Sequence, residues 1–267
     1  MISLAEDCRR IQPCCEGFPA VGVQIYGHFV GYRNRYPFCT TWICHDGQYL
    51  WGVLGRYNQS LRFSSVLPPT SEQLRELWAF LPVTGCSTLE GEQETLRRLS
   101  QVGNMAAKDF YGCAAMTYLG EKPPLGNEGA INTSPRLDDV FRILRDGHLY
   151  FARTAQYDQW LCDNSHRLRH GLGWTVTMEN SATASVCALS PGFGVIASVA
   201  TLPEHRGKGY ASALVQWCVR QLMESGRQPV LMAGSEQVLP MYRRLGFVHT
   251  GAWGILKMES PENTGER

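Results

Sequence analysis

One apolar stretch organises the carboxyl-terminal half of the chain. Residues 195–201 are mostly apolar and β-branched, and they lie between Gly194 and Pro203. A short run of this kind is typical of a strand that is buried on both faces. From Ala211 to Ser225, apolar residues recur three and four positions apart, which predicts an amphipathic helix that ends before Gly226.

The same patterns predict the remaining elements of this half. Helices are expected over residues 135–145 and 156–169, strands over residues 173–178, 182–189 and 229–233, and an antiparallel pair of strands over residues 247–250 and 253–258. The dipeptide Glu179-Asn180 indicates a hairpin between two of these strands. A short helix is expected around Tyr242, with Pro240 in its first turn.

The amino-terminal half also mixes strands and helices. Strands are expected over residues 20–30, 40–45, 48–54, 61–66, 83–88 and 110–118, and helices over residues 71–81 and 90–99. Asp46-Gly47 predicts a tight hairpin. Because strands, helix, strand, helix and strand follow in the same order as in the other half, this half is either a degenerate copy of one fold or an unrelated α+β cap.

The composition of residues 121–129 is that of a linker, rich in Pro, Gly and polar residues. We therefore expect a first domain over residues 1–128 and a second over residues 129–259. Residues 260–267 are polar and are expected to form a disordered tail.

Bulk composition limits the classes of function. The chain has 267 residues, 44% of them hydrophobic and 18% charged, with a formal net charge of +1. A general nucleic-acid binder would need a surplus of basic residues, so we expect no nucleic-acid partner. No amino-terminal targeting pattern and no apolar run of membrane-spanning length is visible, so we expect a soluble, cytoplasmic protein that does not bind membranes. Its oligomeric state is left open.

The ten cysteines are scattered, and none forms a C-x-x-C pair. Reduced thiols that serve as small buried hydrophobic residues are the first expectation, so no metal is predicted. A structural zinc site near Cys39, Cys44 and His45 is the weaker alternative.

The turn between the central strand and the long helix is rich in glycine. It reads Arg206-Gly-Lys-Gly-Tyr-Ala211. The first amides of a helix have no partners within the helix and lie at the positive end of its dipole, so they favour the binding of a phosphate. Small residues at this turn allow the phosphate to approach the backbone closely. A Walker A loop and a dinucleotide fingerprint both fit this turn poorly, because their remaining Gly and acidic positions are missing. A turn without a ligand is the other alternative.

Two motifs carry a resemblance to a known family. Arg206-x-x-Gly209-x-Ala211, after the turn 202–205, resembles the acetyl-coenzyme A motif of the GNAT N-acetyltransferase superfamily. The stretch 239–247, Leu-Pro-Met-Tyr-Arg-Arg-Leu-Gly-Phe, resembles the tyrosine motif of that family at the usual spacing. The resemblance implies a mixed α/β fold of the GNAT type in the carboxyl-terminal domain. It also favours a tandem arrangement with a degenerate first copy.

The resemblance further implies the residues that bind acetyl-CoA. They are Val199, Ala200 and Thr201 for the pantetheine arm, Arg206, Gly207, Lys208, Gly209, Tyr210 and Ala211 for the pyrophosphate, and Ser235 at a position where many members have Asn. Tyr242 corresponds to the residue that protonates the departing thiolate, since a phenol with a pKa of about 10 is protonated at neutral pH.

The acceptor side is less defined. Since the first two helices border the acceptor site in this family, His166 and His170 are candidates there, and so is Glu179. The strand over residues 230–233 lacks the glutamate base of many members. The general base is therefore open among Glu179, Glu236, His166 and a chain of waters.

These motifs predict an N-acetyltransferase that moves an acetyl group directly from acetyl-CoA to a primary amine of a small molecule or peptide. Two alternatives stay open. One is a non-catalytic sensor that binds acyl-CoA, and the other is an acyltransferase that uses a longer acyl-CoA.

Overall fold

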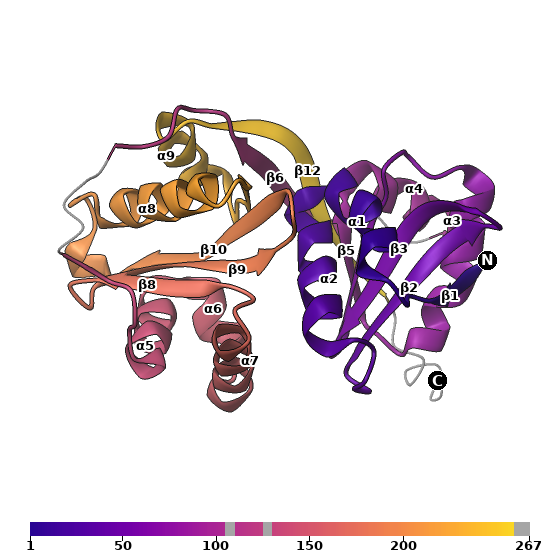
Figure 1. Cartoon of the computed structure of the whole chain (residues 1–267), viewed down its shortest axis with the longest axis horizontal. Helices are drawn as coiled ribbons and strands as arrows, with labels where there is room; N and C mark the ends of the chain where they lie inside the picture. Colours follow the sequence, from indigo (N-terminus) through magenta and orange to yellow (C-terminus); the bar gives the residue numbers. More distant parts are fainter. Residues whose placement is uncertain (105–109, 125–129, 259–267) are drawn as a thin grey trace. The chain divides into compact units, whose positions relative to one another are not determined.

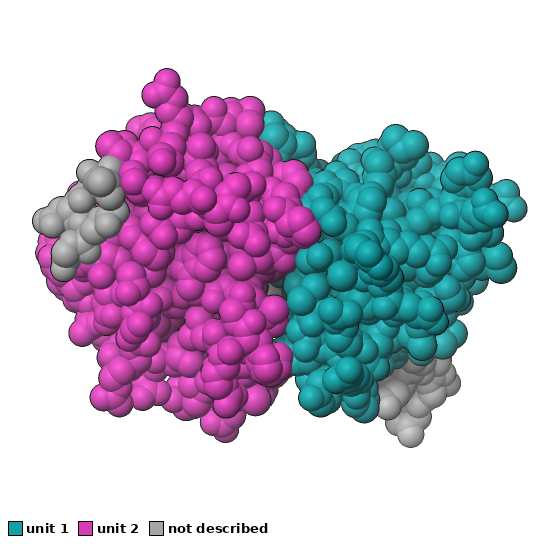
Figure 2. Space-filling model, in the orientation of Figure 1, with its two compact units in different colours: residues 1–116, 232–236, 249–267 teal, residues 117–231, 237–248 magenta. Residues whose placement is uncertain are grey.

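The computed structural model describes residues 1–104, 110–124 and 130–258. Two compact units divide the chain (Figure 2). Unit 1 is Met1–Met116, Met232–Glu236 and His249–Arg267, and unit 2 is Thr117–Leu231 and Gln237–Val248. The boundary predicted at residue 128 and the tail predicted over residues 260–267 lie outside the described residues, and the first change of unit falls between residues 116 and 117.

Unit 1 builds a sheet with helices on both faces. Its elements in chain order are β1 (Ile2–Leu4), α1 (Cys8–Gly17), α2 (Pro19–Tyr32), β2 (Cys39–Asp46), β3 (Tyr49–Tyr57), β4 (Ser60–Ser64), α3 (Ser71–Phe80), η1 (Leu81–Thr84), β5 (Thr88–Glu92), α4 (Gln93–Val102) and most of β6 (Phe110–Tyr118). The strand order is β1-β2-β3-β4-β5, and β4 and β5 are its parallel pair. Helices α1 and α2 cover one face, and α3 and α4 cover the other (Figure 1).

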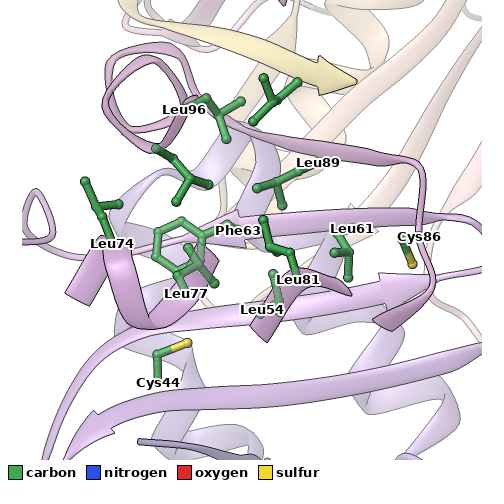
Figure 3. Packing of buried hydrophobic residues seen from close by; sticks show 12 residues of the cluster. Cys44, Leu54, Leu61, Phe63, Leu74, Leu77, Leu81, Cys86, Leu89 and Leu96 are labelled. Atoms are coloured by element: carbon green, nitrogen blue, oxygen red, sulfur yellow. The ribbon is translucent and has the colours of Figure 1, made fainter. Parts of the chain in front are cut away.

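A cluster of buried residues in this unit lies between the sheet and helices α3 and α4 (Figure 3). It consists mostly of leucines from the sheet and the two helices, with Phe63 at its centre: Leu54, Leu61, Leu74, Leu77, Leu81, Leu89, Leu96, Leu99 and Leu256. Burial of this much apolar area stabilises the unit by about 25 cal/mol for each Å² removed from water.

Unit 2 repeats the plan. Its elements are β7 (Ile131–Asn132), α5 (Leu137–Gly147), α6 (Leu149–Thr154), α7 (Tyr157–Arg169), β8 (Trp174–Met178), β9 (Ala182–Leu189), β10 (Phe193–Thr201), η4 (Pro203–His205), α8 (Tyr210–Glu224), most of β11 (Gln228–Met232) and α9 (Leu239–Arg244), while η5 (Glu236–Val238) and β12 (Phe247–Lys257) have residues in both units. The strand order is β11-β10-β9-β8-β7, with β10 and β11 parallel. Helix α8 covers one face, and α5, α6 and α7 lie on the other (Figure 1).

The order of elements is therefore the same twice along the chain. Each time a strand is followed by two helices, three antiparallel strands, a helix, a strand parallel to the preceding one, a helix and a last strand, apart from the short additional helices α6, η1, η4 and η5. This repeated order confirms that both halves have a mixed α/β fold of one type.

Residues 20–30 form helix α2, so the strand predicted there is wrong. The β-branched residues Val21, Val23 and Ile25 favour a strand by propensity, but tertiary packing outweighs that preference. Helix α2 is buried on most of its surface. An added Cβ at Gly22 would lie 2.1 Å from the Cys15 carbonyl oxygen, so α1 packs closely against this helix.

The antiparallel pair predicted over residues 247–258 is also wrong, because these residues form the single strand β12. Trp253–Lys257 pair antiparallel with Thr88–Glu92 of β5, and both segments belong to unit 1. The partner strand is distant in the sequence, so no local pattern announces it. The hairpins predicted at Asp46-Gly47 and Glu179-Asn180 are confirmed.

Candidate active site

Regular pairing of β10 stops in the middle of the strand. Its parallel ladder with β11 runs from Phe193 and Gln228 to Ile196 and Leu231 and ends there. On the other side, the register with β9 shifts between Ala197 and Ala200. Ser198 has a φ of 54°, which places a β-bulge at this point. The backbone around Val199 therefore lies outside the regular ladders on both sides.

The turn after β10 presents an open helix start. Gly207 and Gly209 have φ values of 79° and 82°, in the left-handed region that glycine adopts without steric cost. A Cβ built on either residue meets no other atom within 4 Å. Gly209 is the N-cap of α8 and supplies no side chain to the first amides of the helix. The positive end of this helix dipole therefore faces open space, as an anion site requires.

The side chain of Arg206 turns away from that space. Its Nη2 donates to the Gly147 carbonyl oxygen at 2.9 Å, and its Nε donates to the Thr201 carbonyl oxygen at 3.4 Å. Lys208, whose Nζ lies 3.3 Å from Nδ1 of His205, is a second exposed cation of the turn. Arg206 thus contributes its backbone, rather than its guanidinium, to the helix start.

Glu179 lies beside the start of helix α8. The Tyr210 hydroxyl donates to Oε2 of Glu179 at 2.5 Å, and this bond raises the pKa of Tyr210 above its ordinary value. Glu179 is in the hairpin between β8 and β9, with a φ of 49°. The structure therefore brings this predicted acceptor residue together with the glycine-rich turn.

His166 and His170 stack near the end of α7. Their ring centroids are 4.2 Å apart, with an angle of 35° between the ring planes. Burial, together with the neighbouring His170, lowers the pKa of His166. Because its ordinary pKa is about 6.5, His166 is neutral at pH 7 and can accept a proton.

Tyr242 lies in α9, which begins at Leu239 with Pro240 in its first turn as predicted. The side chain is buried, and its ring packs at 70° against Phe247 with centroids 5.8 Å apart. Burial raises the pKa of Tyr242 to about 12, so the phenol is protonated at neutral pH. Within the part of the chain that the structure describes, its hydroxyl makes no hydrogen bond.

Ser235, a predicted coenzyme-binding residue, and Glu236, a candidate base, follow β11 and belong to unit 1. The other predicted coenzyme-binding residues, 199–201 and 206–211, belong to unit 2. Two features of unit 2 were not predicted from the sequence. They are the bulge at Ser198 and the contact of Gly147 with the end of β10. Neither has a distinctive local pattern.

The described residues offer no sign of a metal, disulfide or membrane site. Across residues 1–104, 110–124 and 130–258, no three His, Cys, Asp or Glu side chains are placed to hold a metal ion. All ten cysteines are free thiols. None of the helices in these ranges is both long and apolar enough to cross a bilayer.

Part of the chain that contains this site matches a known protein family. Residues 137–247 match the model of the acetyltransferase (GNAT) family. These residues include the bulged strand, the glycine-rich turn and Tyr242. No curated protein sequence matches this chain.

Solved structures with the same fold cover nearly all of the chain. A Drosophila protein has a TM-score of 0.64 and 11% identity over 96% of this chain and 98% of its own. A tandem GNAT protein from the clavulanic acid biosynthesis pathway has a TM-score of 0.57 and 12% identity over 97% of this chain and 98% of its own. The chain spans 66% of a GNAT-family structure from Novosphingobium aromaticivorans, with 18% identity over 56% of this chain and a TM-score of 0.45. Residues 137–247 therefore match the GNAT acetyltransferase family, and the fold of the whole chain is similar to that of a tandem GNAT protein.

Proposed function

We propose that unit 2 binds acetyl-CoA and transfers its acetyl group to a primary amine of a small molecule or peptide. The observation that carries this proposal is the open start of α8. Two glycines with positive φ precede it, no side chain caps it, and a Cβ built on either glycine would have no neighbour within 4 Å apart from the adjoining residues. An exposed helix start of this kind favours a diphosphate.

Two sets of residues in unit 2 would hold the co-substrate. Backbone amides of residues 206–211 would bind the pyrophosphate, and backbone groups of Val199, Ala200 and Thr201 would bind the pantetheine arm where the strand ladder ends. Because backbone groups do most of this work, the identity of several of these side chains matters little.

The reaction forms one bond and breaks another. The amine nitrogen attacks the carbonyl carbon of the thioester, the carbon–sulfur bond breaks, and the amine loses a proton as the thiolate gains one. The amide near Val199, at the bulge, is placed on a backbone segment outside the regular ladders and would stabilise the oxyanion.

Tyr242 would act on the departing thiolate. Its pKa of about 12 exceeds that of an ordinary thiol, about 8.5, by roughly 3.5 units, which corresponds to about 5 kcal/mol for a complete proton transfer. We therefore assign Tyr242 the role of a hydrogen-bond donor that stabilises negative charge on sulfur, with proton transfer completed as the thiol leaves.

The group that accepts the proton of the amine stays open. His166 is neutral at pH 7, and the carboxylate of Glu179 already accepts a hydrogen bond from Tyr210. The neutral imidazole therefore has the protonation state that a base needs, while Glu236 and a chain of waters stay alternatives.

Unit 1 has closed the positions that are open in unit 2. Thr70 caps α3, its side chain accepting from the Gln73 amide while the Gln73 side chain accepts from the Thr70 amide. The last pair in the β4–β5 ladder is Arg62 and Glu90, whose side chains form an ion pair at 2.9 Å. We therefore assign coenzyme binding to unit 2 alone.

Replacement of Gly209 by Ala should weaken the binding of coenzyme A by at least about tenfold, because the methyl group enters the space before the helix start. Gly226, after the other end of α8, also has a positive φ and open surroundings, and Gly226→Ala is the matched control. Both changes should cost about 1 kcal/mol of stability. Isothermal titration of the two variants checks this, and equal affinities would count against the site at Gly209.

Tyr242→Phe should lower kcat by about tenfold to a hundredfold with little change in coenzyme affinity, since a hydrogen bond to the leaving group is lost. Release of free thiol from acetyl-CoA in the presence of a panel of amines measures turnover. Unaltered turnover would remove Tyr242 from the mechanism. Binding of acetyl-CoA by the wild type without any turnover would favour the sensor.

The raised pKa of Tyr242 also predicts a pH dependence of stability. The unfolded phenol titrates near pH 10 and the folded one near pH 12, so this contribution is complete below about pH 10 and is lost as the pH rises towards 12. Two pKa units correspond to about 2.7 kcal/mol as an upper limit. Denaturant unfolding at about pH 8 and pH 11 should show that the free energy of unfolding falls more for the wild type than for Tyr242→Phe. An equal fall in both proteins would contradict this prediction.

One coenzyme A should bind to each chain, because the positions in unit 1 that correspond to the site are filled by Thr70, Gln73, Arg62 and Glu90. Calorimetric titration with free coenzyme A gives the stoichiometry directly. Two equivalents for each chain would show that the first copy has kept its site.

A further inference from the structure

The guanidinium of Arg206 joins the glycine-rich turn before α8 to the junction between α5 and α6, which is called the corner below. We infer that Arg206 is a positioning residue that transmits coenzyme binding at the turn to the helices on the opposite face of the sheet of unit 2. The inference rests on the proposed function, because it requires that coenzyme A binds at this turn.

The contact is made at the end of helix α5. Gly147 is the last residue of this helix, and the final four carbonyl groups of a helix have no acceptor role within it. Arg206 Nη2 donates to one of them at 2.9 Å, while Nε reaches the Thr201 carbonyl oxygen at 3.4 Å. A cation at this end of a helix is also favoured by the helix dipole. One side chain therefore holds together two segments of backbone.

Close packing makes this corner sensitive to small shifts. A Cβ at Gly147 would lie 3.0 Å from the Thr201 carbonyl oxygen and 3.3 Å from Cβ of Ala200. Ala200 and Leu202 form a buried cluster with residues of α5 and with the partly buried Phe151 and Trp160. The end of β10, which is the expected pantetheine site, is thus part of the same packed cluster as α5, α6 and α7.

Helix α6 begins directly after the contact. His148 ends α5 and is the N-cap of α6, where its Nδ1 accepts from the Phe151 amide at 3.3 Å. A displacement of Gly147 therefore moves the start of α6 as well. Figure 1 shows α5, α6 and α7 on one face of the sheet and α8 on the other, so the Arg206 side chain links elements of opposite faces.

Coenzyme binding has a direct effect on this link. Gly207 and Gly209 give the turn a wide choice of backbone conformations, and a phosphate bound to its amides would select one of them. Fixing the backbone of Arg206 also fixes the origin of its side chain, so the hydrogen bond to Gly147 is formed for more of the time. By linkage, an ordered corner in turn favours coenzyme binding.

Amide hydrogen exchange in α6 reports the link without any acetyl transfer. The amides of Ala152 and Ala155 donate to the carbonyl oxygens of His148 and Phe151, and their exchange rates measure local opening. In the wild type, saturating free coenzyme A should slow their exchange. In Arg206→Ala, exchange should be about five- to tenfold faster without coenzyme A and should not respond to it, as loss of an exposed charged hydrogen bond implies.

Two further variants make the result specific. Gly147→Ala pushes the end of α5 away from Thr201 without a change of charge and should also remove the response, with coenzyme affinity within about threefold of the wild type. Arg145→Ala removes a cation from the same helix turn, where Arg145 pairs with Asp146, and should leave the response intact.

The outcomes separate this inference from the proposed function. If the wild type binds no coenzyme A, both fail. If it binds coenzyme A and the α6 amides of the wild type do not respond, only the positioning role is overturned. A loss of coenzyme affinity of more than about tenfold in Arg206→Ala, with α6 exchange unchanged, would show that the guanidinium holds phosphate and would overturn the inference in favour of direct binding.

Discussion

The site in unit 2 depends on the point at which the ladder between β10 and β11 ends. Parallel strands satisfy the polar groups of one another, and this pair does so only as far as Ile196 and Leu231. Beyond it, the bulge at Ser198 removes β10 from register with β9 as well. Backbone groups without strand partners must find water or a ligand, so the end of the ladder creates binding capacity from the main chain itself.

The two copies of the fold show how such a capacity is lost. In unit 1, the last pair of the parallel ladder is an ion pair of two largely buried side chains, and the following helix has its own cap. A charged pair of this kind is held by mutual attraction, because either charge alone would be costly to bury. The backbone differs as well, because Gly209 precedes α8 with a φ of 82°, whereas Thr70 precedes α3 in an extended conformation with a φ of −69°. Copies of one fold thus differ in local backbone and in side chains, which is why a shared fold does not establish a shared function.

Where local pattern decides a structure, the sequence predicts it well. The strand over residues 195–201, the helix after it and the hairpin at Glu179-Asn180 are all confirmed, because their period and turn residues agree with their surroundings. The prediction of a strand over residues 20–30 is wrong, because the β-branched residues of α2 are buried against their surroundings. One of these partners is α1, which approaches closely at Gly22. Burial over most of the helix surface weakens the period that identifies a helix.

The same division applies to the site. Its glycine-rich turn is visible in the sequence, since positive φ values need glycine at those positions. The partner of the Arg206 side chain is not visible, because Gly147 lies 59 residues earlier and has no side chain to mark it. Contacts to backbone atoms leave no trace in the identity of the residue contacted.

The last strand of the chain has a consequence for biosynthesis. Residues 253–257 complete the sheet of unit 1, whose other strands lie in the first 116 residues. During translation, one edge of β5 lacks its β12 partner until residues 117–248 have been made. Most of these residues belong to unit 2. Exposed strand edges invite association with other chains, and distant pairings form slowly. The sheet of unit 1 is therefore complete only after residues 253–257 have been made, and loss of this strand would expose an edge of unit 1 rather than of unit 2.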